Sequence, residues 1–162
     1  MKLTQRIFSG LLIVLSPPVL SSDNLEVLVV TATRAEKALA EIPVNADLVS
    51  GETLELTAHT HISESLARVA GSWISRGNGQ EHLTALRSPV LTGAGGCGAF
   101  LMAQDGVSLR AAGFCNINQL FEANTEQAGR IEVIKGPGTA LYGSNAMHGL
   151  INVIRPCIAL EP

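Results

Sequence analysis

The sequence predicts a single α+β domain with a short-stranded mixed sheet, two short helices and long loops. Three observations predict this class. The chain has 162 residues, which is enough for one hydrophobic core but not for two. Short runs rich in β-branched residues alternate with connections that contain glycine or proline. Helix signals are confined to two short segments, residues 50–56 and 60–71.

The composition excludes two broad classes of protein. The chain has four Phe, one Trp and one Tyr, whereas a transmembrane β-barrel carries two girdles of aromatic residues and roughly eight or more strands. A self-sufficient outer-membrane pore is therefore excluded. The net charge is −3, with 11 Lys and Arg against 14 Asp and Glu, so the chain lacks the basic surplus that binding to phosphates requires. No nucleic-acid partner is expected.

Residues 1–22 have the three-part layout of a secretory signal peptide. Lys2 and Arg6 form a basic head, an apolar run follows, and small residues precede a cleavage site after Ser21 or Ser22. A membrane anchor is the alternative, but the apolar run is far shorter than the ~20 residues that span a bilayer. The sequence therefore predicts an exported protein.

Export makes disulfide bonds possible, so the three cysteines need an interpretation. Cys97 and Cys115 each lie in a glycine-containing loop, with a predicted hairpin between them, and are the candidate pair. Two free buried thiols are the alternative. Cys157 is left without a partner near the end of the chain.

The chain is expected to divide into three parts after the signal peptide. Residues 23–43 form an extended N-terminal segment, residues 44–156 the main domain and residues 157–162 a tail that departs from its pattern. Within the first part, residues 25–33 form a β-branched run without turn residues, which predicts an extended strand.

Both predicted helices lie early in the main domain. Residues 50–56 predict a short helical turn. In the second helix, Ile62, Leu66 and Val69 recur at helical spacing, Thr60 is the expected N-cap, and Gly71 follows the end.

The remaining segments are strands and loops. The predicted strands cover residues 44–49, 73–76, 82–87, 99–104, 107–109, 130–134 and 150–154. Asp105 and Gly106 predict a tight turn between two of them. Residues 88–98 and 110–124 are loops, and the final strand places Asn152 among apolar neighbours.

No motif in the chain predicts an enzyme, a cofactor or a metal site. Residues 93–98 match Gly-x-Gly-x-x-Gly, but the helix that a dinucleotide site requires does not follow them. His59 and His61 lack a third His or Cys nearby, so a solvated helix entry is favoured over a metal site. No Gly-x-Ser-x-Gly sequence occurs.

The informative segment is residues 130–154. It reads Arg-Ile-Glu-Val-Ile-Lys-Gly-Pro, then Ala-Leu-Tyr-Gly, and ends in Leu-Ile-Asn-Val-Ile. This pattern resembles the end of the plug domain of TonB-dependent outer-membrane receptors. The fold expected from the resemblance is that small plug domain, with its long loops at the apical end.

Other segments resemble the same family. One run is similar to the TonB box, the extended segment captured by the energy-transducing protein TonB; it comprises Glu26, Val27, Leu28, Val29, Val30, Thr31 and Ala32. Residues 63–71 resemble the plug helix, and residues 101–107 the strand and Asp-Gly turn after it. The sequence departs from the family pattern at Ala70, Ser88 and His148.

The resemblance implies partners and roles for named residues. A 22-stranded barrel, absent from this chain, would surround the plug and, with it, bind a metal chelate or cobalamin-like ligand. Arg87 and Lys135 would pair with barrel carboxylates, and without a barrel both are expected to be solvated. The expected ligand-facing residues of the apical loops are Gly93, Gly95, Gly96, Arg110, Phe114 and Asn116. A Cys97–Cys115 bond would tie these loops together.

The sequence therefore predicts the gate of an uptake receptor, with an iron–siderophore chelate as the expected nutrient. The protein would lie in the outer membrane as part of a full receptor, and in the periplasm if expressed as this chain alone. The pattern is lost after Ile154, which favours a truncated or frame-interrupted receptor that does not transport by itself. A stand-alone periplasmic module that binds TonB-like partners is the alternative.

Overall fold

A five-stranded mixed sheet forms the centre of the computed structural model, which describes residues 28–29, 31–78, 82–90, 99–110 and 123–156. The strands in sheet order are β3 (Asn45–Ser50), β8 (Arg130–Lys135), β9 (Gly149–Ile154), β6 (Phe100–Gln104) and β7 (Val107–Ser108). β6 and β9 are parallel, and the other pairs are antiparallel. The mixed sheet predicted from the sequence is confirmed.

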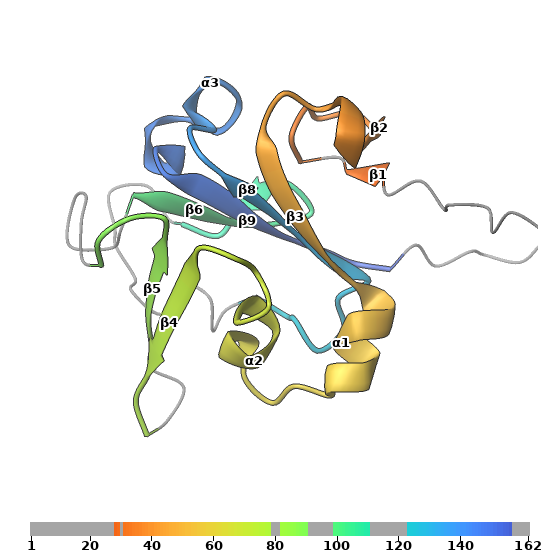
Figure 1. The fold of residues 1–162 in the computed structure, drawn as a ribbon, viewed down its shortest axis with the longest axis vertical. Helices are drawn as coiled ribbons and strands as arrows, with labels where there is room; N and C mark the ends of the chain where they lie inside the picture. Colours follow the sequence, from red (N-terminus) through yellow and green to blue (C-terminus); the bar gives the residue numbers. More distant parts are fainter. Residues whose placement is uncertain (1–27, 30, 79–81, 91–98, 111–122, 157–162) are drawn as a thin grey trace, which may run out of the picture.

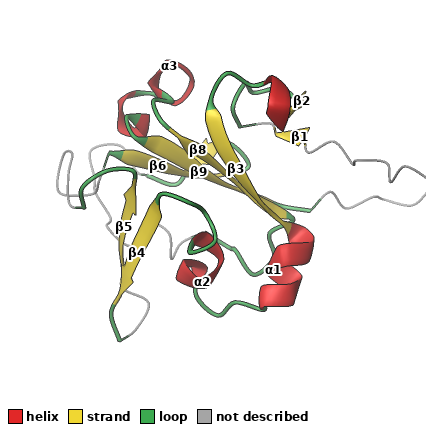
Figure 2. Ribbon diagram, in the orientation of Figure 1, coloured by secondary structure: helices red, strands yellow, loops and turns green. Residues whose placement is uncertain are grey.

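Helices and a hairpin cover one face of this sheet (Figures 1 and 2). They are α1 (Gly51–Thr57), α2 (Ile62–Leu66), β4 (Ser72–Arg76) and β5 (His82–Leu86). β4 and β5 pair only with each other, in a separate antiparallel sheet. The core between these layers includes Leu54, Leu66, Leu86, Phe100, Met102, Ile131, Val133 and Ile151.

The N-terminal segment covers the opposite face, together with the connection between β8 and β9 (Figure 1). The elements there are β1 (Leu28–Val29), β2 (Lys37–Ala38), η1 (Leu39–Glu41), α3 (Thr139–Tyr142) and η3 (Ser144–Ala146). Their core includes Val29, Ile42, Leu101, Ile134 and Leu150. The domain therefore has three layers, and both faces of the central sheet are buried.

The two predicted helices form, and their caps explain where they begin. The Ser50 hydroxyl accepts a hydrogen bond from the Thr53 amide at 3.2 Å, so Ser50 is the N-cap of α1. In α2 the prediction of Thr60 as N-cap is wrong: His61 takes this position because its Nδ1 accepts from the Ser63 amide at 3.1 Å. The Thr60 amide instead donates to the Glu64 carboxylate at 3.1 Å.

The predicted strands of the main domain form within one or two residues of their expected ends. The Asp105-Gly106 turn also forms, with positive φ at both residues (49° and 79°), as a two-residue hairpin turn requires. The extended strand predicted for residues 25–33 is wrong at its end, because the chain turns at residues 31–34. None of the helices in the described part of the chain has both the length and the hydropathy of a membrane-spanning segment.

Gly149 begins β9 at a position that excludes any side chain. Its φ is +156°, and a Cβ there would lie 2.3 Å from the Ile134 carbonyl oxygen and 2.3 Å from a Leu86 methyl group. The close approach lets β9 pair with β8 while Leu86 packs above it. Gly106 is different: its φ is +79°, but a Cβ there would meet nothing within 4 Å.

We predict that Gly149→Ala lowers the free energy of unfolding by about 3 kcal/mol, since it adds a steric clash to backbone strain. Gly106→Ala, the matched control, adds backbone strain alone and should cost about 1 kcal/mol. Urea unfolding followed by far-ultraviolet circular dichroism measures both values. Equal losses in the two variants would contradict the close approach at Gly149.

Candidate functional site

Thr31 anchors the N-terminal segment to the rest of the domain through all three of its polar atoms. Its amide donates to Glu132 Oε2 at 2.7 Å, its carbonyl oxygen accepts from the Tyr142 hydroxyl at 2.8 Å, and its Oγ1 accepts from Asn152 Nδ2 at 2.8 Å. Thr31 has no exposed surface. Because Glu132 and Asn152 are directly opposite each other on β8 and β9, the segment is tied to the middle of the sheet.

The Glu132 carboxylate is fully buried and therefore needs partners for its charge. Besides the Thr31 amide, it accepts a hydrogen bond from Arg130 Nε at 2.7 Å, and the Arg130 side chain is 30% exposed. Asn152 is satisfied in the same way, since its Oδ1 accepts from the Gly106 amide at 3.0 Å. Glu132 and Asn152 thus bind the N-terminal segment, and Asn152 also connects it to the turn between β6 and β7.

Arg34 and Tyr142 form a second contact between the segment and the domain. The Arg34 guanidinium lies 4.8 Å from the centre of the Tyr142 ring, and its Nη2 donates to the Leu141 carbonyl oxygen at 2.6 Å. Burial raises the pKa of Tyr142 above its ordinary value of 10.0, although the Arg34 charge opposes this shift. The phenol therefore stays protonated at neutral pH and can donate to Thr31.

A cavity of about 380 Å³ lies beside these contacts. Its lining comprises Arg34, Asp105, Gly106, Arg130, Tyr142, Asn152 and Ile154. Five of these residues take part in the network around Thr31 and Tyr142, so the network borders a space that solvent can enter; they are Arg34, Gly106, Arg130, Tyr142 and Asn152.

The structure places part of the predicted TonB-box segment and corrects its conformation. Leu28 and Val29 are extended in β1 and pair with Ala38 and Lys37. Val29 and Ala32 are buried, and Thr31 and Ala32 lie in a turn. The turn forms because Glu132 and Asn152 of the sheet and Tyr142 of α3 satisfy the polar groups of Thr31, in place of a neighbouring strand. Glu26, Val27 and Val30 lie outside the described residues.

Lys135 does not have the environment predicted for it. The expectation that it is solvated is wrong: its side chain is only 4% exposed and pairs with Asp47 Oδ2, while Nζ also donates to the Ala70 carbonyl oxygen at 3.2 Å. Asp47 is on β3, diagonally opposite Lys135 on the same face of the sheet. The charge is therefore satisfied inside the domain.

Arg87 is exposed, and the structure brings its backbone to the same turn as Lys135. Its amide donates to the Gly71 carbonyl oxygen at 2.8 Å, next to the Ala70 carbonyl that Lys135 binds. The Arg87 side chain lies across Gly71, where a Cβ would be 3.0 Å from its Cγ. The turn after α2 thus contacts both Arg87 and Lys135, the two residues expected to pair with barrel carboxylates. Their separation in the sequence does not indicate that they share this turn.

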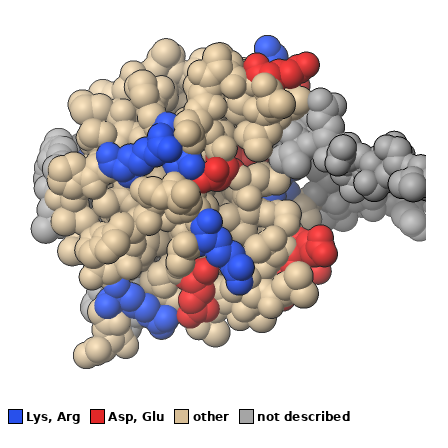
Figure 3. Space-filling model, in the orientation of Figure 1, with Lys and Arg blue, Asp and Glu red and all other residues tan. Residues whose placement is uncertain are grey.

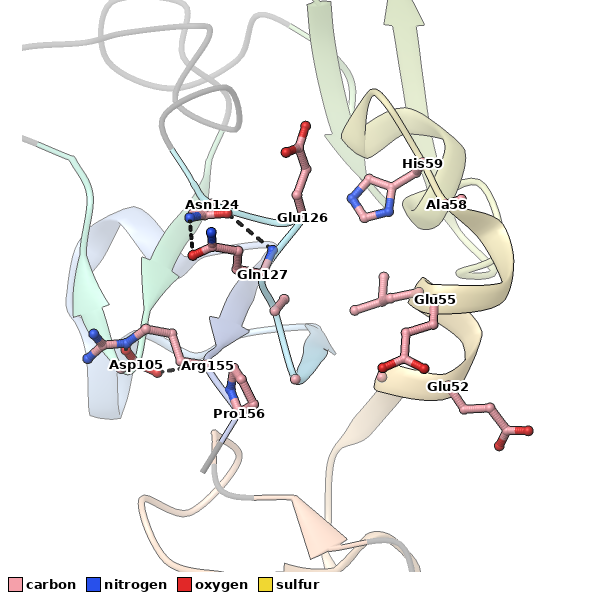
Figure 4. A pocket seen from close by; sticks show the side chains of 14 residues that line it. Glu52, Glu55, Ala58, His59, Asp105, Asn124, Glu126, Gln127, Arg155 and Pro156 are labelled. Atoms are coloured by element: carbon pink, nitrogen blue, oxygen red, sulfur yellow. Dashed lines mark hydrogen bonds and ion pairs between the residues drawn. The ribbon is translucent and has the colours of Figure 1, made fainter. Parts of the chain in front are cut away.

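A large cleft lies between α1 and the segment before β8 (Figure 4). It measures about 1330 Å³, and Glu52, Glu55 and Glu126 contribute acidic side chains. His59 points into it but is largely buried and hydrogen-bonded to the Thr125 hydroxyl at 3.0 Å. Within the described ranges, no three His, Cys, Asp or Glu side chains are grouped so that they could hold a metal ion.

Arg155 closes one side of this cleft by pairing with Asp105 (Figure 4). Partial burial raises the pKa of Asp105, but the backbone and side-chain hydrogen bonds from Arg155 and its charge together outweigh burial and lower the pKa below 3.8. Asp105 is therefore ionised at neutral pH. The contact joins the β6–β7 turn to the end of β9.

The charged side chains on the face in Figure 3 form small separate groups. Lysine and arginine atoms lie next to aspartate and glutamate atoms, and no continuous basic surface is visible on this face. This distribution agrees with the small net charge of −3.

Most of the predicted apical site lies outside the described residues. Arg110 is described and half-buried. The other members of that site, and the candidate disulfide, fall in the undescribed ranges 91–98 and 111–122: Gly93, Gly95, Gly96, Phe114, Asn116, Cys97 and Cys115. The signal peptide and Cys157 are also outside the described part of the chain.

A comparison with protein families matches residues 38–150 to the TonB-dependent receptor plug domain. The chain belongs to this family. The match begins at β2, includes β3, β6, β7 and β8 of the central sheet, together with Glu132, Lys135 and Tyr142, and ends within β9.

A curated relative agrees with this assignment. The vitamin B12 transporter BtuB of Vibrio vulnificus strain CMCP6 is 37% identical over 130 residues, which are 80% of this chain and 20% of the relative. The chain thus spans about a fifth of the length of that relative.

Two solved structures share the fold. The pyoverdine outer membrane receptor FpvA from Pseudomonas aeruginosa PAO1 matches with a TM-score of 0.62 and 21% identity, over 80% of this chain and 18% of the receptor. The alcaligin outer membrane receptor FauA from Bordetella pertussis matches with a TM-score of 0.58 and 17% identity, over 80% of this chain and 21% of the receptor. At these identities the likeness concerns the fold.

Sequence reasoning missed the residues that complete each polar contact. Asp47 looked like an ordinary residue of a short strand, and Glu132 was only part of the family pattern. Asn152 among apolar neighbours was a usable signal, since a polar residue on a buried face needs a partner. The sequence does not show that this partner is Thr31.

We predict that Asp47→Ala costs about 2 kcal/mol, because it leaves the buried Lys135 ammonium without its partner. This value is lower than the typical loss for a fully buried pair, since the Asp47 side chain is 34% exposed. Adding Lys135→Met to Asp47→Ala should recover most of the loss. Urea unfolding of the single and double variants measures it, and a double variant no more stable than Asp47→Ala would contradict the pairing.

We also predict that Tyr142 titrates above pH 10.0. Its raised folded-state pKa means that its contribution to stability is complete below pH 10 and is lost as the pH rises through the folded-state pKa. Tyr142 is the only tyrosine in the chain, so phenolate absorbance reports it directly. Arg34→Gln should raise the midpoint further, because the Arg34 charge favours the phenolate. A wild-type midpoint at or below 10.0 would rule out the buried phenol.

Proposed function

We propose that this chain is the gate of a TonB-dependent receptor that takes up a scarce nutrient, and that it is not an enzyme. The family match over residues 38–150 carries the proposal. Two further facts support it. The segment before the match resembles a TonB box, and its described part is docked on the domain through Thr31.

The proposed ligand is a metal chelate, in particular an iron–siderophore complex, or a cobalamin-like molecule. Support comes from the relatives, which are named as a vitamin B12 transporter and as receptors for pyoverdine and alcaligin. We assign ligand contact to the apical loops that contain residues 93–96 and 110–116, with a Cys97–Cys115 bond between them. Ligand contact is also expected from the loops of the surrounding barrel.

The proposed assembly places the chain inside a 22-stranded barrel in the outer membrane. Arg87 is exposed and therefore available to a barrel carboxylate. Lys135 can pair with a barrel carboxylate only if that carboxylate replaces Asp47, because Asp47 already neutralises the charge of Lys135. Transport requires the barrel, so the chain alone is proposed to be transport-incompetent.

A second candidate is a stand-alone periplasmic module that binds TonB-like proteins. It is favoured by the internal pairing of Lys135 with Asp47, since the buried charge then needs no barrel. Fractionation of cells that express the chain separates the candidates. A plug seated in a separately encoded barrel sediments with the outer membrane, whereas a stand-alone module is released with the periplasm.

TonB binding by the N-terminal segment is the property to test. An extended segment binds by adding a strand to a sheet edge, and main-chain hydrogen bonds supply much of the affinity. Val27→Pro removes one backbone donor within the predicted motif and should weaken binding to the C-terminal domain of a TonB-type protein about tenfold or more. Titration calorimetry measures the affinity.

Asp23→Pro is the matched control, because it places the same residue just before the motif. Its affinity should equal that of the wild-type chain. Unchanged binding in Val27→Pro, or a wild-type chain that binds no TonB-type protein, would overturn the proposed interaction.

A further inference from the structure

We propose that Thr31 is a fixed joint between the N-terminal segment and the sheet, so that a partner captures only the residues before Thr31 and any pull on them reaches β8 and β9 directly. The proposal rests on the proposed function, because it assigns the point at which TonB capture ends. It concerns Thr31, Glu132, Asn152 and Tyr142 of this chain.

The first argument is that Thr31 has no polar atom left to offer a partner. Its amide, carbonyl and hydroxyl groups are each hydrogen-bonded at 2.7–2.8 Å. Strand addition needs free amide and carbonyl groups on the added segment. A partner that pairs with Thr31 must therefore first break bonds to both Glu132 and Tyr142.

The second argument is that these bonds are expensive to break. Thr31 and Glu132 have no exposed surface, and Asn152 is 3% exposed. Removing one bond leaves a buried polar group without a partner, or a buried carboxylate with fewer partners. The three bonds converge on one residue from β8, β9 and α3, so loosening one element does not release the other two.

The segment before Thr31 is held by one short strand pair and by the burial of Val29. Among the described residues, β1 has two residues and pairs with the two residues of β2. A two-stranded ribbon of this kind is at most marginally stable by itself. Val29 is also buried in the core, so a partner strand that replaces β2 must draw this apolar side chain out of it. Capture of Val29 breaks no side-chain hydrogen bond, whereas capture of Thr31 breaks three hydrogen bonds to the domain.

The third argument concerns the direction in which a pull is transmitted. Glu132 and Asn152 face each other across β8 and β9, which are paired over six residues at the centre of the sheet (Figure 1). Asn152 also binds the Gly106 amide in the β6–β7 turn. Tension on the segment thus reaches the central strands and the turn that leads toward Arg110.

Hydrogen exchange of the 162-residue chain tests the joint. Thr31→Val removes the acceptor for Asn152 and keeps the shape of the side chain, so amides in residues 28–34 should exchange about tenfold faster. Thr33→Val is the matched control: the Thr33 hydroxyl bonds only locally, to the Ala35 carbonyl oxygen at 2.7 Å. Its exchange rates should equal those of the wild-type chain.

A second variant keeps the test valid if Thr31→Val does not fold. Tyr142→Phe removes only the donor to the Thr31 carbonyl and should accelerate exchange of the same amides severalfold. In both variants, amides of β8 and β9 should keep their slower exchange, since the joint opens without unfolding the sheet. Wild-type exchange rates at residues 28–34 in both variants, or equal acceleration throughout the sheet, would overturn the joint.

Binding to a TonB-type C-terminal domain separates this proposal from the proposed function. When that domain is added, amides before Thr31 should change their exchange, while the Thr31 amide stays protected. If the Thr31 amide is protected from exchange but the chain binds no such domain, the result supports the joint and overturns only the proposed function. A chain that binds it and loses protection at Thr31 overturns the joint alone.

Discussion

The need to satisfy two polar residues on a buried sheet face determines how the N-terminal part of this protein folds. Glu132 and Asn152 lie opposite each other on β8 and β9 and have almost no exposed surface. A buried carboxylate and a buried amide are stable only with hydrogen-bond partners. Thr31 supplies partners for both, and this requirement fixes the turn at residues 31–34 and the docking of the segment over the sheet.

The opposite face has a polar contact of its own, and the two faces differ in what they connect. Lys135 pairs with Asp47 and binds the turn after α2, where the backbone of Arg87 is also attached. One face therefore binds the segment that resembles a TonB box. The other face carries Lys135 and contacts Arg87, the two residues that the family resemblance expects to pair with a barrel. Because β8 carries Glu132 and Lys135 on opposite faces, a shift of this strand would affect both contacts.

Particular elements show how far the sequence predicts this structure. The strands at 130–135 and 149–154 and the Asp105-Gly106 turn follow from β-branched runs and turn chemistry, which are local properties. The N-cap of α2 and the turn at Thr31 differ from what the sequence predicts. In each case a backbone amide donates to a specific side chain, and this bond decides the local conformation: the Ser63 amide donates to His61, and the Thr31 amide donates to Glu132.

The sequence by itself determined the fold class, the order of the strands along the chain and, through the pattern in residues 130–154, the family. Alternation along β8 and β9 also indicates which side chains share a face. Only the tertiary structure decided what covers each face: Asp47 beside Lys135, and Thr31 above Glu132 and Asn152. The reason is that these contacts join residues 88 to 121 positions apart, and local patterns carry no information about partners at that distance.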